Sequence, residues 1–88
     1  MNLTQLQFVQ AIAETGSFSR AAERCFVTQP TLSNAVAHLE DELGGRLFSR
    51  TTRKVGLTPL GEHLLPFIRS ALGAIDDLLQ SAKLYKSP

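Results

Sequence analysis

The sequence predicts a mainly α-helical domain that contains one small two-stranded hairpin and ends in a long helix. Three observations indicate this fold class. Apolar residues recur at helical spacing in four segments. Capping residues and glycines separate these segments. Between the third and fourth segments, two short apolar runs flank a basic stretch, which is typical of a hairpin. The 88 residues are enough for one small domain of this kind.

The first helix is expected over residues 2–15, where apolar side chains recur on one face. Gly16 comes next, at the position where the end of a helix favours glycine. Ser17 or Ser19 can cap the next helix, and Phe18 is expected to pack back onto the first one. The role predicted for the first helix is therefore to support the two helices after it.

Residues 21–40 predict two helices joined by a tight turn. Two adjacent alanines at the start of this stretch allow close approach to a neighbouring helix. Phe26 and Val27 then form a segment that is too short and too apolar for a solvated loop. Thr28 can cap the second of the two helices, and Pro30 is tolerated in its first turn because the missing N–H has no intrahelical partner there.

The second of these helices has two different faces. Its apolar stripe has the spacing i, i+4, i+7 and i+11 and consists of Leu32, Val36, Leu39 and Leu43. Its other face carries Gln29, Thr31, Ser33, Asn34 and His38. Short uncharged donors and acceptors suit hydrogen bonding to base edges in a major groove, whereas an ordinary solvated face, which is the alternative, more often carries Glu and Lys. Residues 18–43 thus predict a helix-turn-helix.

Residues 46–57 have the pattern of a small antiparallel hairpin with a basic tip, which would form a wing. The apolar runs at residues 47–48 and 55–57 flank the tip, where Arg53 and Lys54 lie. Beside a reading helix, such a tip would approach phosphates or a minor groove, where narrowing concentrates negative potential. The alternative is a solvated basic loop. With the wing, the predicted fold becomes a winged helix-turn-helix.

The last helix is expected to start at the cap Thr58 and the first-turn residue Pro59, and to bend at Pro66. If unbroken to Tyr85 it would be about 40 Å long. A heptad pattern predicts a long apolar seam made of Leu64, Ile68, Ala71, Ile75, Leu78, Ala82 and Tyr85, widened by Leu65, Leu72 and Leu79. One small domain cannot cover this seam, so a second copy of the helix is expected to do so. Packing on the first helix of the same chain would account only for the beginning of the seam.

Five motifs occur in order along the chain: FSRAA at 18–22, VTQPTLS at 27–33, LEDELG at 39–44, LFSR at 47–50 and LTPLG at 57–61. They resemble the amino-terminal DNA-binding domain of LysR-type transcriptional regulators, and the resemblance covers essentially all 88 residues. QPTLS, LEDELG and RTTRKV look most like the peroxide-sensing branch. The resemblance implies bacterial transcription regulation, an antiparallel pair of linker helices, and a DNA contact by the wing arginine that corresponds to Arg53.

The resemblance also implies two parts, a DNA-binding domain at residues 1–58 and a linker helix for dimerisation at 59–88. Family members continue into an effector domain, so we expect the chain to be a fragment whose small-molecule inducer binds elsewhere, and a tetramer in the full-length protein. The predicted base contacts are Gln29, Pro30, Thr31, Ser33 and Asn34. The predicted contacts to the DNA backbone or minor groove are Ser17, Thr28, Arg50, Arg53 and Lys54. The predicted dimer helix uses Leu64, Ile68, Ala71, Leu72, Ile75, Leu78, Leu79 and Ala82.

The composition is that of a soluble globular protein, with no apolar run near the ~20 residues that span a membrane, and a cytoplasmic location is expected. The net charge of +1 alone indicates no partner, but the cations between Gly44 and Gly56 form a local basic patch without acids. Cys25 is expected to be a structural thiol, although the adjacent Arg24 keeps a reactive thiol open as the alternative.

No metal site, cofactor or catalytic function is expected. The single residues Cys25, His38 and His63 match no zinc spacing, and the consecutive acids at residues 40–42 point in different directions around a helix. Two other classes of function stay open. A protein-interaction module would use the long helix to recruit a partner, with no DNA readout. A small hydrolase-like enzyme would need a nucleophile, a base and an orienting group, and no such set can be drawn.

Overall fold

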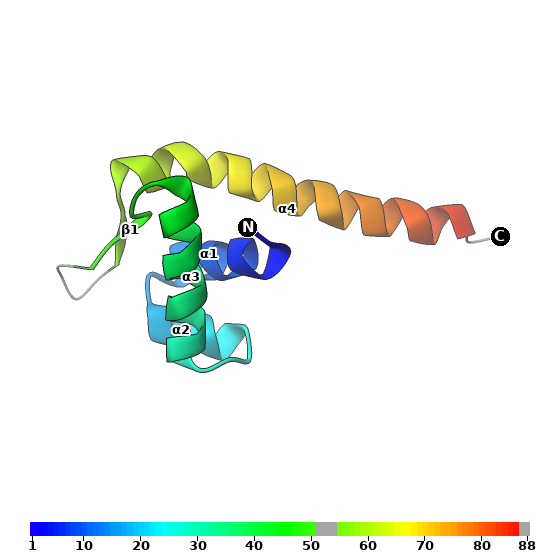
Figure 1. Cartoon of the computed structure of the whole chain (residues 1–88). Helices are drawn as coiled ribbons and strands as arrows, with labels where there is room; N and C mark the ends of the chain where they lie inside the picture. The colour runs from blue at the N-terminus through cyan, green and yellow to red at the C-terminus, as the bar shows by residue number, and fades with distance from the viewer. Residues whose placement is uncertain (51–54, 87–88) are drawn as a thin grey trace.

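The computed structural model describes residues 1–50 and 55–86 (Figure 1). It confirms the mainly helical fold with one two-stranded antiparallel sheet. The elements, in chain order, are α1 (Leu3–Thr15), α2 (Phe18–Arg24), α3 (Gln29–Leu43), β1 (Phe48–Ser49), β2 (Gly56–Leu57) and α4 (Pro59–Lys86).

Local capping explains where the first two helices begin and end. Asn2 and Gln5 form a reciprocal capping box at the start of α1, so two amide groups of the first turn are satisfied. Gly16 ends α1 in the left-handed conformation with φ 68°, as predicted. Of the two candidate serines, Ser17 is the cap of α2, and its Oγ accepts from the amide of Arg20 at 3.1 Å.

Helix α3 lies across α1 and α2 and carries its apolar stripe into the core (Figure 1). Leu32, Val36 and Leu39 are fully buried there. Thr28 caps the helix and Pro30 lies in its first turn, as predicted from the sequence. Gly44 ends the helix with φ 87°. The burial of one face fixes which residues of α3 point outward.

The turn between α2 and α3 differs from the expectation for an apolar segment. Val27 packs partly against the core, but Phe26 is 95% exposed and has φ 59°, in the left-handed region. The turn reverses the chain within a few residues, and it does so by giving one residue a positive φ that directs its side chain away from the core. The prediction that Phe26 avoids solvent was therefore wrong.

The hairpin forms with Phe48 opposite Leu57 and Ser49 opposite Gly56. Phe48 is buried, and its ring meets the ring of Phe18 edge-to-face at a centroid distance of 5.9 Å. This aromatic contact joins the base of the wing to the start of α2. The predicted basic tip, with Arg53 and Lys54, lies outside the described residues.

Helix α4 runs without interruption through Pro66, and its carboxyl-terminal half projects beyond the other helices (Figure 1). Its first turns belong to the core of the same chain, where Leu65, Ile68 and Leu72 are buried. Beyond Leu72 no residue of α4 is fully buried, and the projecting helix contributes to principal extents of 53 × 26 × 19 Å. None of the helices in residues 1–50 and 55–86 is both long and apolar enough to cross a membrane.

Candidate nucleic-acid interface

The structure leaves the predicted reading face of α3 accessible. Gln29, Pro30, Thr31 and Asn34 are exposed, and Ser33 is half-buried at the edge of the same face. All five lie in the first two turns of α3, and they point away from the core because Leu32, which lies among them, is buried in it. The helix therefore presents hydrogen-bonding groups and one proline ring rather than charges at this end.

Thr28 connects the cap of α3 to this face. Its hydroxyl accepts from the amide of Thr31 at 3.4 Å and donates to the Thr31 hydroxyl at 2.9 Å. The Thr31 oxygen thus accepts from Thr28, which leaves its own hydrogen to donate outward. The hydrogen bonds by which Thr28 caps α3 therefore also orient the Thr31 hydroxyl as a donor at the surface.

A concave surface of about 240 Å³ lies between the start of α2, the first turns of α3 and the base of the wing. Ser17, Gln29, Ser33 and Arg50 all line it. The structure therefore brings two predicted base contacts together with two predicted backbone contacts, although they come from separate segments of the chain. The hollow thus combines hydroxyl and amide donors with one guanidinium cation, and such a set suits a ligand rich in acceptor oxygens.

Arg50 is held by two contacts that the sequence did not reveal. Its guanidinium carbon lies 4.3 Å from the centroid of the Phe18 ring, and its Nη2 lies 3.5 Å from Oε1 of Glu40. Glu40 is buried, and its Oε2 accepts from the backbone amide of Leu47 at 2.7 Å. About a third of the Arg50 side chain remains exposed, at 36%. The Glu40 carboxylate thus joins α3 to the backbone of Leu47, which leads into the wing, and to the guanidinium of Arg50 at the base of the wing.

The role of Glu40 was missed from the sequence, although a signal was present. Glu40 comes after Leu32 and Val36 at intervals of four residues, so it occupies a position on the apolar stripe of α3. A buried carboxylate needs donors around it. The acid at this position therefore pointed to a polar partner in the segment after the helix.

The residues predicted for the dimer helix fall into three groups by burial. Ile68 and Leu72 are buried in the core of the single chain, where they pack with the helices that precede α4. Leu64 and Ile75 are half-buried, whereas Ala71, Leu78, Leu79 and Ala82 are exposed. Leu84 and Tyr85 are also exposed, at 74% and 92%. Within α4 the exposed large apolar side chains are therefore Phe67 near its start and Leu78, Leu79, Leu84 and Tyr85 in its projecting part.

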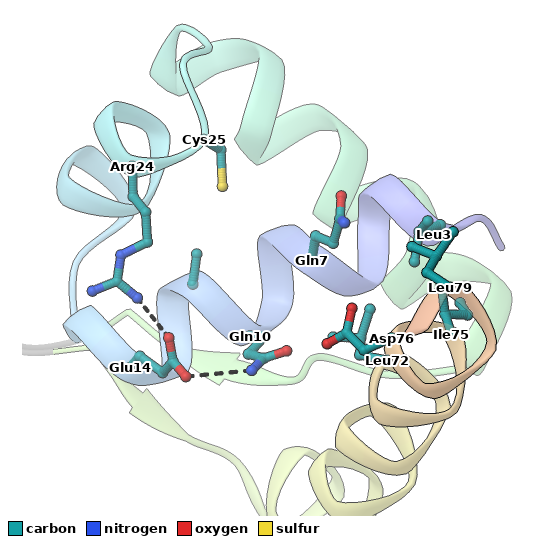
Figure 2. A pocket seen from close by; sticks show the side chains of 11 residues that line it. Leu3, Gln7, Gln10, Glu14, Arg24, Cys25, Leu72, Ile75, Asp76 and Leu79 are labelled. Atoms are coloured by element: carbon teal, nitrogen blue, oxygen red, sulfur yellow. Dashed lines mark hydrogen bonds and ion pairs between the residues drawn. The ribbon is translucent and has the colours of Figure 1, made fainter. Parts of the chain in front are cut away.

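Cys25 points into a separate, open hollow of about 270 Å³ between α1, the end of α2 and α4 (Figure 2). The thiol is half-buried and packs against the core. Arg24 reaches in a different direction and donates to Oε1 of Glu14, which lies on α1 (Figure 2). Arg24 and Glu14 line the same hollow as Cys25, but the guanidinium of Arg24 is paired with Glu14. His, Cys, Asp and Glu form no cluster that could hold a metal ion within residues 1–50 and 55–86.

Comparison with known proteins gives the family. The family model for bacterial regulatory helix-turn-helix proteins of the lysR family matches residues 3–62. The regulator IlvR of Caulobacter vibrioides is 47% identical over 83 residues, which are 94% of this chain and 28% of that protein. The hydrogen peroxide-inducible genes activator of Escherichia coli O157:H7 is 44% identical over 82 residues, which are 93% of this chain and 27% of that protein. The two identities are similar, so they do not single out the peroxide-sensing branch.

Solved structures agree with this assignment. The crystal structure of the BenM DNA-binding domain with catB site 1 DNA matches with a TM-score of 0.95 and 33% sequence identity. The match covers 100% of this chain and 98% of the BenM chain. By contrast, the chain spans less than a third of the length of IlvR and of the peroxide-inducible activator. The chain therefore belongs to the LysR family of bacterial regulatory helix-turn-helix proteins and corresponds to their DNA-binding domain.

Proposed function

We propose that this chain binds specific sequences of double-stranded DNA as a homodimer and forms the DNA-recognition part of a transcriptional regulator. The observation that carries this proposal is the exposed, uncharged polar face at the start of α3, which adjoins the base of the wing. The close match to a BenM domain in complex with DNA supports the same function.

The start of α3 would enter the major groove. Gln29 and Asn34 both have an amide that can pair bidentately with adenine. Pro30 would offer an apolar contact to a thymine methyl group, and Thr31 and Ser33 can donate to or accept from several bases. Each of the five residues is at least partly accessible, so none needs the core to open before contact.

The backbone contacts would hold α3 in register. Ser17 and Arg50 line the same hollow as Gln29, and Thr28 lies directly before the helix. Arg53 and Lys54 are proposed for the phosphates or minor groove beside the wing, on the basis of the sequence. Contacts of this type fix position and supply affinity, whereas sequence is read by the base contacts.

Dimerisation would use the projecting part of α4, with two helices packed antiparallel along Ala71, Ile75, Leu78, Leu79 and Ala82. On this proposal residues 1–58 bind DNA and residues 59–88 join the two copies. The two reading helices would then contact half-sites about 34 Å apart, or a multiple of that spacing. Two adjacent large leucines that are more than half exposed, Leu78 at 66% and Leu79 at 56%, favour such a partner.

Leu78→Glu is expected to shift the dimer toward monomer, because it would place a charge in the centre of the apolar contact between the two helices. Gln80→Glu adds the same charge to an exposed position on another face of α4 and is expected to leave the assembly unchanged. Sedimentation velocity over a range of concentrations checks both variants. A sedimentation coefficient that Leu78→Glu leaves at the wild-type value would contradict the proposed interface.

Selection of bound duplexes from a random-sequence pool tests the proposed function directly. The expected result is enrichment of a pair of inverted half-sites, because a two-fold symmetric dimer reads the same bases twice. Enrichment of a single unpaired site would support DNA binding but not the dimer. Enrichment of no sequence would reject the proposed function and favour a protein-interaction module.

The remaining features of the whole protein are proposed from the family. We place the inducer site on a part of the regulator outside these 88 residues, assign no catalytic role to the chain, and propose a cytoplasmic protein that is a tetramer at full length. None of the residues assigned to DNA contact or dimerisation is required to act as a nucleophile or base.

A further inference from the structure

We propose that Glu40 is a positioning residue for DNA binding, which sets the guanidinium of Arg50 for contact with a phosphate. This inference rests on the proposed function. Glu40 itself is buried at 6% exposure and cannot reach DNA, so its effect would pass through Arg50.

The geometry defines the plane and the edge of the Arg50 guanidinium. The ring of Phe18 lies 4.3 Å away and supports the guanidinium group on one side. Glu40 faces one edge through the contact of 3.5 Å between Oε1 and Nη2. A guanidinium has five N–H donors in one plane, so the edge turned away from Glu40 is left to form a fork toward a phosphate.

The carboxylate is itself held in place. Its other oxygen accepts from the Leu47 amide at 2.7 Å, and the Leu47 carbonyl accepts from the Thr58 amide at 3.0 Å. Glu40 is therefore bonded to the backbone where the chain enters the hairpin, at a residue that is itself bonded to the backbone where the chain leaves it. Its contact with Arg50 is longer than the ~2.8 Å of a strong charge-assisted hydrogen bond. The pair therefore orients the guanidinium but leaves N–H donors of Arg50 available for a phosphate.

The position of Arg50 also suits a bound strand. Arg50 lines the hollow that contains Gln29 and Ser33, and it also lines a second hollow together with Asp41 and Gly44. Arg50 therefore lies next to both the first turns of α3 and its carboxyl-terminal end. A phosphate bound there would lie next to the groove that α3 enters, and a strand fixed at this point would set the register of Gln29.

The test is a set of DNA titrations with the 88-residue chain and a duplex that the wild type selects from a random pool. Glu40→Gln keeps an acceptor for the Leu47 amide but removes the charge that orients Arg50. We expect it to bind about threefold to tenfold more weakly, a coupling typical of residues in one network. We expect no further loss when it is added to Arg50→Ala. Arg50→Ala alone should lower the slope of log affinity against log salt by about 1.

Asp41→Asn is the matched control, because it removes one negative charge from the neighbouring, exposed position of α3. It is expected to leave affinity unchanged or increase it, whereas Glu40→Gln is expected to weaken binding. Thermal unfolding shows whether each variant is folded at the temperature of the titration. If Glu40→Gln does not fold, Arg50→Lys replaces it, since Lys keeps the charge without the planar fork. Weaker binding of folded Arg50→Lys is then expected.

Two results would overturn the positioning role. One is wild-type or higher affinity for Glu40→Gln, or for Arg50→Lys where that variant is used. The other is an equal loss from Glu40→Gln in the wild-type and Arg50→Ala backgrounds. Both leave DNA binding by the wild type intact. Failure of the wild type to select any duplex is a different result, which rejects the proposed function and the positioning role with it.

Discussion

Gly61→Ala is expected to destabilise the fold by about 3 kcal/mol or more, at the upper end of the range for overpacking a core. Gly61 lies in the first turn of α4, directly against the backbone of residue 47. A Cβ at this position would overlap the carbonyl oxygen of Leu47 and lie 3.0 Å from both its carbonyl carbon and Cδ2 of Leu57. The Leu47 backbone cannot easily withdraw, because Glu40 and Thr58 hold its amide and carbonyl.

Gly73→Ala is the matched control for this prediction. Gly73 lies in the same helix, and a Cβ there would meet nothing within 4 Å. Alanine is the better helix former, so this variant is expected to stabilise α4 by up to about 1 kcal/mol. Urea unfolding followed by circular dichroism measures both changes. Equal stability of the two variants would contradict the close packing of α4 on the entry to the wing.

Gln29→Ala is expected to reduce discrimination at one base pair by about 1–3 kcal/mol, with a much smaller loss on random DNA. Gln29 is exposed at the start of α3 and lines the hollow beside Ser33 and Arg50. Its amide can donate and accept in the same plane, which distinguishes adenine from the other bases. The residue is uncharged, so the dependence of affinity on salt should not change.

Gln7→Ala removes the same amide from an exposed position on α1 that is not among the residues proposed to contact DNA, and is expected to leave both affinity and specificity unchanged. Mobility-shift titrations on the selected duplex, on duplexes with single substitutions and on random DNA measure the effect. Equal losses on selected and random DNA for Gln29→Ala would count against direct readout. Circular dichroism provides the check on folding, and alanine is well tolerated in the first turn of a helix.

The order and type of the elements could be predicted from the sequence because the signals are local. Caps such as Thr28 and terminators such as Gly16 act within a few residues, and their effect does not depend on distant parts of the chain. The face of α3 that points outward could be predicted from the spacing of its apolar residues, since a helix that buries one face must expose the other. The candidate base contacts were identified for the same reason.

Only the tertiary structure decided which charged residues have partners within the chain and which apolar residues are covered by its other helices. Glu40 appeared as one of three consecutive acids, but packing buried it and joined it to Arg50, ten positions further on. Ile68 belongs to the same heptad pattern as Leu78, yet Ile68 is buried and Leu78 is exposed, because the carboxyl-terminal half of α4 projects beyond the other helices. Phe26 was expected to avoid solvent, and its positive φ turned it outward. Periodicity identifies the faces of a helix, whereas the partner of each face depends on how segments distant in the chain pack together.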